Sequence, residues 1–184
     1  MKIGIDSGGS HIGAGIILDK GMLVGVETRD LKISKNDSAS KVENIIIDTI
    51  QEEIKVLLDR YNYDVFDVSK IGVAAPGSAK DGKIQNVVNL NIKSFDIKKK
   101  LEEIYDAKVI VNNDGKCAGY AEKELGTLRN SDDCVFLCIG TGVGSAVFLN
   151  GELLKPKQNV GFELGHMVID KNGLKCNCGR LRML

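Results

Sequence analysis

The sequence predicts an α/β protein in which one strand–turn–strand unit occurs twice. Near the amino terminus, the predicted strand Lys2–Asp6 leads into Ser7–Ser10 and then into the apolar stretch Ile12–Leu18. A second unit later in the chain has the same order: Val135–Ile139, Gly140–Gly144 and Ala146–Leu149. Apolar runs separated by glycine-containing turns are typical of β-hairpins. The repetition indicates that the chain contains two related halves.

Composition and charge restrict the class of protein. The apolar fraction of 43% and the charged fraction of 27% are those of a globular protein. The formal net charge is zero, so overall charge draws the chain neither to nucleic acid nor to an anionic membrane. The apolar runs are too short for a signal peptide or a membrane span. Five cysteines, an odd number, argue against a disulfide framework. We therefore expect a cytoplasmic protein.

Helices and further strands are predicted between the two repeated units. Apolar residues recur at helical spacing at Val42, Ile46, Ile50, Ile54 and Leu57. Asp37 or Ser38 is the expected N-cap of this helix. A buried strand is predicted at Ile71–Ala75, stopped by Pro76 and Gly77.

A second helix is predicted from Phe95, Ile97, Leu101 and Ile104, with Lys98–Lys100 as a solvated surface. A strand at Val109–Val111 and a third helix after Asn113-Asp114 complete the series. The order βββ-α-β-α-β-α, followed by a second βββ, predicts a ribonuclease-H-like lobe at residues 1–115. Residues 116–184 would then form the first part of a second, duplicated lobe. Cys117, Cys134 and Cys138 are expected to be reduced core residues.

The two glycine-rich turns are candidate phosphate-binding sites. Glycine lets the backbone approach an anion and adopt positive φ, so the N–H groups of such turns form an anion-binding concavity. Ser10 and Thr141 add hydroxyl donors. Asp6, at the end of the first strand, is placed to hold a Mg²⁺-bound water. Either turn alone is as readily a plain hairpin, but two in one context predict turns that face each other around a polyanion.

Two further segments carry candidate chemistry. Asn113-Asp114 lies where a buried strand meets a helix N-terminus, which suits either an Asx turn or N-cap or a general base for a substrate hydroxyl. His166, Cys176 and Cys178 lie at short spacing in one loop region, which suggests a structural Zn²⁺ site. No fourth ligand follows downstream.

Together these residues resemble the ROK family of sugar kinases and repressors, within the actin/hexokinase-like ATPase superfamily. Seven short signals fall in the family's order: Asp6–Ser10, Pro76-Gly77, Asn89-Leu90, Asn113-Asp114, Gly140–Gly144, Glu163–His166 and Cys176–Gly179. His11, Gly115 and Ser145 depart from the family's usual residues. At the zinc motif, Arg182 and Met183 stand where the family has Gly-Cys, so this resemblance is to a member truncated at its C-terminus.

The resemblance implies a kinase that transfers phosphate from ATP to a hexose or N-acetylhexosamine. Asp114 would be the catalytic base. The implied sugar-binding residues are Gly77, Asn89, Asn113, Glu163 and His166. The residues implied for ATP and Mg²⁺ are Asp6, Gly8, Gly9, Ser10, Gly140, Thr141, Gly142 and Gly144. Zinc would be held by His166, Cys176 and Cys178. Because members of the family commonly form dimers, the resemblance also implies a homodimer.

Two alternatives to an active kinase stay open. The chain could be a truncated, catalytically inactive fragment that retains at most weak sugar binding. It could also belong to the repressor branch, whose members carry a helix-turn-helix domain ahead of the first glycine hairpin. Because that hairpin begins here at residue 2, we expect a kinase and no nucleic-acid partner.

Overall fold

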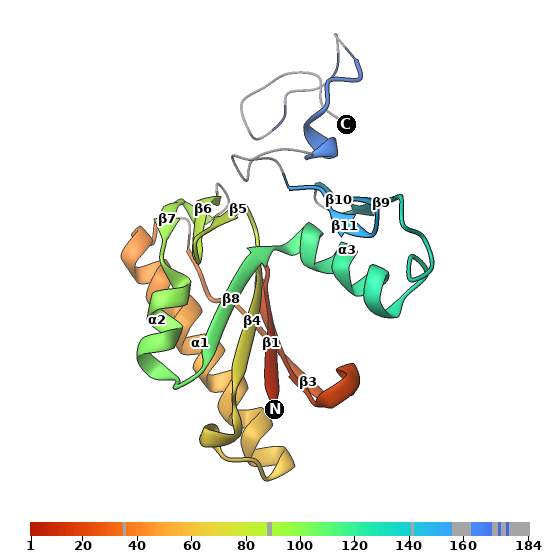
Figure 1. Ribbon diagram of the computed structural model, residues 1–184. Coiled ribbons are helices and arrows are strands. Elements are labelled where there is room, and N and C mark those ends of the chain that lie inside the picture. The colour runs from red at the N-terminus through yellow and green to blue at the C-terminus, as the bar shows by residue number, and fades with distance from the viewer. Residues whose placement is uncertain are drawn as a thin grey trace. The chain divides into compact units, whose positions relative to one another are not determined.

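The structure is a computed structural model that describes residues 1–34, 36–87, 90–140, 142–155, 163–170, 173 and 176. Contacts along the chain divide it into two compact units, Met1–Asn113 and Asp114–Leu184. The predicted lobe boundary at residue 115 is close to this division, and the assignment of the units as duplicated lobes stays a prediction. Each unit is described by itself (Figure 1).

A five-stranded sheet forms the centre of the first unit. In spatial order its strands are β3 (Leu23–Asp30), β2 (His11–Ile17), β1 (Lys2–Ser7), β4 (Lys70–Ala75) and β8 (Lys108–Asn113). The first three strands pair antiparallel, and β1, β4 and β8 pair parallel. Figure 1 shows β1, β4 and β8 side by side. The parallel strands therefore end at the same edge of the sheet.

Two helices cover one face of this sheet. Helix α1 (Ala39–Tyr61) begins after Ser38, whose hydroxyl accepts a hydrogen bond from Lys41 N, and it ends at Asn62 in the left-handed conformation. Its N-cap is confirmed. A hydrogen bond from Lys41 lowers the pKa of Asp37 just before it. Helix α2 (Ile97–Ile104) begins after Asp96, whose carboxylate accepts from Lys99 N.

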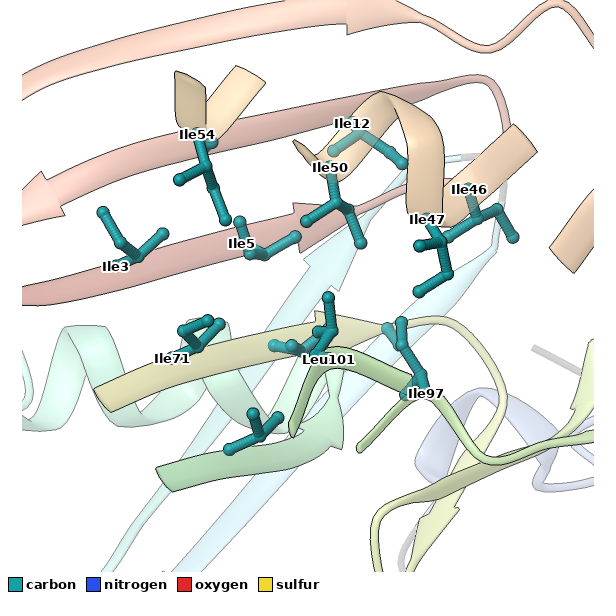
Figure 2. Close-up of a cluster of buried hydrophobic side chains, with 14 of the residues drawn as sticks. Ile3, Ile5, Ile12, Ile46, Ile47, Ile50, Ile54, Ile71, Ile97 and Leu101 are labelled. Atoms are coloured by element: carbon teal, nitrogen blue, oxygen red, sulfur yellow. The ribbon is translucent and has the colours of Figure 1, made fainter. Parts of the chain in front are cut away.

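The core of the first unit lies between these helices and the sheet. Figure 2 shows Ile50 and Ile54 of α1 near Ile5 of β1, with Ile46 and Ile47 of the same helix farther along the same cluster. Alternate residues of β1 and β4 are buried, and Ile3, Ile71 and Val109 share one register row. Since side chains alternate between the faces of a strand, Gly4, Gly72 and Ile110 lie on the opposite face. Apolar burial on the helix side is thus what sets the register.

A small second sheet between β4 and α2 was absent from the sequence prediction. Its strands are β5 (Ser78–Lys80), β6 (Lys83–Val87) and β7 (Ile92–Phe95). Asp81 and Gly82 both have positive φ in the turn between β5 and β6, and Asp-Gly is a strong hairpin signal. Phe95 belongs to β7 rather than to the second helix. That assignment was wrong because a single apolar residue fits the period of a helix or of a strand. Ile104 ends helix α2 as predicted, with its side chain exposed.

The second unit contains a three-stranded sheet and a helix. The sheet order is β11 (Glu152–Leu153), β10 (Val143–Leu149) and β9 (Cys134–Ile139), all antiparallel. Helix α3 (Asp114–Leu125) packs on it, with Tyr120 edge-on to Phe148 at 5.6 Å between ring centroids. An added Cβ on Gly119 would lie 2.4 Å from Ala146 Cβ. Glycine there allows the close packing of helix and sheet.

The described strands confirm the repeated unit that the sequence predicted. In both units a hairpin is followed by a turn and a third antiparallel strand. The second turn uses Lys20-Gly21 (in the short helix η1, Asp19–Gly21) in one unit and Asn150-Gly151 in the other, and all four residues have positive φ. This match extends the likeness from sequence to backbone conformation.

Two other sequence predictions have mixed outcomes. Lys98 and Lys99 form ion pairs with Glu102 and Glu103 on the surface of α2, as expected of a solvated helix face. Cys117, Cys134 and Cys138 are reduced, as predicted, and are half-buried rather than fully buried. Of the three, Cys134 packs against the core of the second unit. None of the described helices is long and apolar enough to cross a membrane.

The assignment of faces predicts different costs for two isoleucines on adjacent strands. Ile71 is 0% exposed and Ile110 is 54% exposed. Ile71→Ala should lower the free energy of unfolding by about 2–5 kcal/mol, because it leaves a cavity in the core. Ile110→Ala should cost less than about 1 kcal/mol, mainly in strand propensity. Urea denaturation measures both, and equal losses would contradict the register described above.

Candidate functional site

The predicted site residues of the first unit follow its three parallel strands. Ser7, Ala75 and Asn113 end β1, β4 and β8, so the first glycine turn, Pro76-Gly77 and Asn113 share the carboxyl edge of the sheet. Open α/β sheets bind ligands outside the carboxyl ends of their strands. The topology therefore brings together three motifs that are far apart in the sequence.

Asp6 lies on the exposed face of β1, one residue before the strand ends. Its register partners are Gly13 of β2 and Ala74 of β4, and Ala74 pairs in turn with Asn112. An added Cβ on Gly13 would lie 3.9 Å from Asp6 Cβ. The exposed carboxylate thus stands between small residues, and its oxygens are suited to Mg²⁺ or to a Mg²⁺-bound water.

The first glycine turn is closed by a hydrogen bond from Gly8 N to His11 O of 2.9 Å. Ser10 Oγ lies 3.3 Å from His11 Nδ1. A Cβ added to Gly9 would meet no heavy atom within 4 Å, so the backbone is open to a ligand there. Ser7, just before the turn, is 1% exposed, and its Oγ has no hydrogen-bond partner in the described part of the chain.

The second glycine turn is one residue shorter. Ile139 pairs directly with Val143, whereas Ser7 pairs with Ile12. Gly140 N donates to Gly142 O at 2.9 Å, and added Cβ atoms on Gly140 and Gly142 would meet nothing within 4 Å. The two turns are therefore alike in openness and different in length.

These glycines do not use the left-handed conformation. Among the described glycines, positive φ occurs at Gly21, Gly77, Gly82 and Gly151, and not in either predicted phosphate turn. Of the two properties of glycine noted from the sequence, close approach and positive φ, the described glycines of these turns do not use positive φ. What glycine provides at Gly9, Gly140 and Gly142 is the absence of a side chain over exposed backbone.

Gly77 and Asn113 are joined within the first unit. Asn113 is buried, and its Nδ2 donates to Gly77 O at 2.9 Å. Gly77 has φ +80°, and an added Cβ would lie 2.4 Å from Gln85 O. Only glycine fits this turn after β4. The side chain of Asn113 thus holds the Gly77 turn against the end of β8.

Asp114 is the first residue of α3 and is exposed. Its Oδ1 accepts a 2.7 Å hydrogen bond from Gly115 N, and a carboxylate at a helix N-terminus is favourably placed in the field of the helix dipole. Gly115 is buried. An added Cβ on Gly144 would lie 3.3 Å from Gly115 Cα, so the two glycines bring strand β10 close to the start of α3.

The loop that carries Glu163 is attached to β10 at two points. Ser145 is 1% exposed, and its Oγ accepts from Leu164 N at 3.0 Å. Gly165, in the short helix η4 (Leu164–His166), is buried against Val143, whose carbonyl oxygen would lie 2.3 Å from an added Cβ. His166 is exposed at the end of η4.

Glu163 has a partner that sequence reasoning did not identify. Its Oε1 lies 3.2 Å from Nζ of Lys116 in the first turn of α3. Ser145 was likewise noted only as a departure from glycine, although its hydroxyl holds the loop. A lysine at a helix N-terminus opposes the helix dipole, and that signal marks Lys116 as a residue with a specific partner.

The structure describes only some of the other residues that the sequence predicted to bind zinc, sugar or phosphate. Asn89, Thr141 and Cys178 lie outside the described residues. Within the described ranges, no group of three or more His, Cys, Asp or Glu side chains is arranged to hold a metal ion. The zinc site and the homodimer therefore stay predictions.

A hollow of about 300 Å³ lies away from these residues, beside the C-terminal half of α1. The residues that line it are Gln51, Ile54, Lys55, Leu58, Asp59, Tyr63, Asp64, Val65 and Tyr105. Val65 is the first residue of the short helix η2 (Val65–Asp67). Burial raises the pKa of Tyr105 to about 12. The lining offers no glycine turn and none of the predicted site residues, so the hollow is not the candidate site.

Comparisons with known proteins show which sequences and structures this chain resembles. The xylose repressor of Bacillus subtilis (strain 168) is 32% identical over 180 residues, covering 97% of this chain and 45% of the repressor. The glucokinase of Halalkalibacterium halodurans is 30% identical over 181 residues, covering 97% of this chain and 53% of the glucokinase. A ROK family glucokinase from Streptomyces griseus, solved with glucose and AMPPNP, has a TM-score of 0.83 at 24% identity over 99% of this chain and 55% of its own.

The structural likeness confirms the predicted α/β fold class, that of the actin/hexokinase-like sugar kinases. The ROK family model matches residues 2–182. The chain therefore belongs to the ROK family. It spans about half the length of the curated relatives that it matches. Because a repressor and a kinase match the same region, this part of the sequence does not by itself separate the two branches.

The Gly77 turn predicts a large difference between two glycines near β4. Gly77→Ala should destabilise the protein by about 2–4 kcal/mol, because it combines left-handed strain with contact against Gln85 O. Gly72→Ala, where an added Cβ meets nothing within 4 Å, should be neutral or stabilising by up to about 1 kcal/mol. Thermal unfolding of the two variants provides the comparison, and a tolerated Gly77→Ala would refute the turn geometry.

Proposed function

We propose that this chain provides the sugar-binding and catalytic residues of an ATP-dependent kinase for a hexose or N-acetylhexosamine, with Asp114 as general base. The observation that carries the proposal is the position of Asp114. It follows β8 at the carboxyl edge of the parallel strands and is exposed at the N-terminus of α3. Membership of the ROK family and the likeness to glucokinases support it.

In the proposed reaction Asp114 accepts the proton of a sugar hydroxyl. The hydroxyl oxygen then attacks the γ-phosphorus of ATP, the bond to the β,γ-bridging oxygen breaks, and ADP leaves. Such a reaction needs mainly positioning and charge neutralisation. Mg²⁺, when bound, would neutralise phosphate charge, and the exposed carboxylate of Asp6 has the hard oxygen ligands that this ion prefers.

The glycine turns are proposed to bind the phosphates through their N–H groups. At Gly9, Gly140 and Gly142 the space above Cα is open, which is what a phosphate oxygen needs to approach the backbone. Glu163, His166 and Asn113, with Asn89 and Gly77, are proposed to contact sugar hydroxyls. A site built from such groups penalises analogues that leave them unpaired.

Sugar binding without phosphorylation is a second candidate, and the similarity to a xylose repressor favours it. The residues proposed for the sugar serve both functions. ATP turnover is what separates them, since only the kinase requires the phosphate turns and the base. A chain that binds sugar and does not turn over ATP would be either a sugar-responsive regulator or an inactive fragment.

Replacing the base should separate chemistry from binding. Asp114→Asn should lower any sugar-dependent ADP release by at least about 100-fold, the usual contribution of general-base catalysis, while sugar affinity changes less than about threefold on the scale of a single neutral contact. A coupled ADP assay and calorimetric titration measure the two. Asp106→Asn, at another exposed carboxylate, is the control. Unchanged turnover in Asp114→Asn would exclude the base assignment.

A methyl group in the second glycine turn should obstruct phosphate without disturbing the fold. Gly142→Ala meets no neighbouring atom, so its thermal unfolding should match that of the original chain. Its affinity for ATP should fall roughly tenfold, through loss of a charge-assisted hydrogen bond from the backbone. Gly72→Ala is the matched control. Equal ATP affinity in both variants would show that this turn does not bind phosphate.

A further inference from the structure

Lys116 contradicts the local preferences of the helix on which it lies. It is in the first turn of α3, where a cation opposes the helix dipole at a cost of about 0.3–1 kcal/mol. Its side chain is only 15% exposed, whereas long cationic side chains ordinarily extend into solvent. A residue that breaks a local rule in two ways usually serves a site.

Lys116 makes a long-range contact with the carboxylate of Glu163. Its Nζ lies 3.2 Å from Glu163 Oε1, across 47 positions in the sequence. The Glu163 side chain is 34% exposed, and its Oε2 makes no hydrogen bond within the described residues. Lys116 therefore holds Oε1 of this carboxylate, and Oε2 is available to accept a hydrogen bond from a ligand.

The rest of the loop is held through its backbone. Leu164 N donates to Ser145 Oγ, and Gly165 packs on Val143. Those two contacts fix the main chain directly after Glu163 but leave the torsions of its side chain undetermined. Lys116 supplies the missing constraint, because an ion pair of low exposure selects one rotamer of a long side chain.

We propose that Lys116 is a positioning residue that fixes the Glu163 carboxylate for a substrate hydroxyl. This rests on the proposed function, in which Glu163 contacts the sugar. Without Lys116 the side chain would have to be ordered when the sugar binds, and that entropy would be lost from the affinity. Lys116 acts through Glu163 and is not assigned a contact with the sugar.

The first experiment replaces Lys116 in the 184-residue chain and measures two quantities. Calorimetric titration with glucose, N-acetylglucosamine and xylose gives the dissociation constants, and hydrogen exchange gives the protection of residues 163–168. Lys116→Met should weaken binding of the preferred sugar about tenfold, the loss of one charge-assisted hydrogen bond, and raise exchange in the loop. Lys116→Arg should restore most of both.

The matched control is Lys123→Met on the same helix. Lys123 Nζ donates to Ser131 O at 2.9 Å, so this variant also removes a lysine contact of α3. Its sugar affinity and loop exchange should equal those of the original chain. If Lys116→Met also equals the original chain in sugar affinity, the positioning role is wrong.

A charge swap distinguishes positioning from a purely structural ion pair. Lys116→Glu combined with Glu163→Lys keeps the pair, so loop protection should return, while sugar affinity should stay low because the carboxylate has moved. Recovery of affinity together with protection would overturn the proposal. If the original chain binds none of the three sugars, the proposed function fails. In that case, hydrogen exchange in the loop that Lys116→Met leaves unchanged would also refute the ordering of the loop by the Lys116–Glu163 ion pair. Raised exchange would support that ordering alone, without a role in sugar binding.

Discussion

The parallel pairing of β1, β4 and β8 is the constraint on which the candidate site depends. Burial of isoleucines against α1 and α2 fixes the register of these strands, since a shift by one residue would turn each buried row to the opposite face. With the register set, Ser7, Ala75 and Asn113 end together. The hydrogen bond from Asn113 to Gly77 O then links two of these ends directly. Hydrophobic packing on one face thereby positions polar groups at the edge.

The second unit uses a related hairpin for a different set of contacts. Its glycine turn is one residue shorter, and the strand that follows carries Ser145 and Val143, which hold the Glu163 loop. Gly144 and Gly115 allow β10 to approach the start of α3, where Asp114 and Lys116 lie. Asp114, the proposed base, and Lys116, the ion-pair partner of Glu163, thus lie in the first turn of one helix. A compact scaffold of small residues is what brings these charged groups together.

Much of the fold could be predicted because its signals are local and periodic. The spacing of apolar and glycine residues predicts the buried stripe of α1, the N-cap at Ser38 and the two hairpins. The order of seven short motifs predicts the family. The small sheet was missed although Asp81-Gly82 signals a hairpin, because its strands are short and Phe95 also suits a helix. The contacts of Lys116 and Ser145 were missed because they join residues far apart in sequence. The sequence predicted glycine turns that are open to a ligand, and the space above Gly9, Gly140 and Gly142 is open.

The central proposal is that this chain contacts a sugar through Gly77, Asn113, Asp114 and Glu163. The most direct test is a titration of the isotope-labelled chain with its preferred sugar, followed by amide chemical shifts. The account predicts that the largest shifts occur at Gly77, Asn113, Asp114 and Glu163. Shifts confined to the hollow beside Leu58 and Tyr105, with those four amides unmoved at saturating sugar, would contradict it.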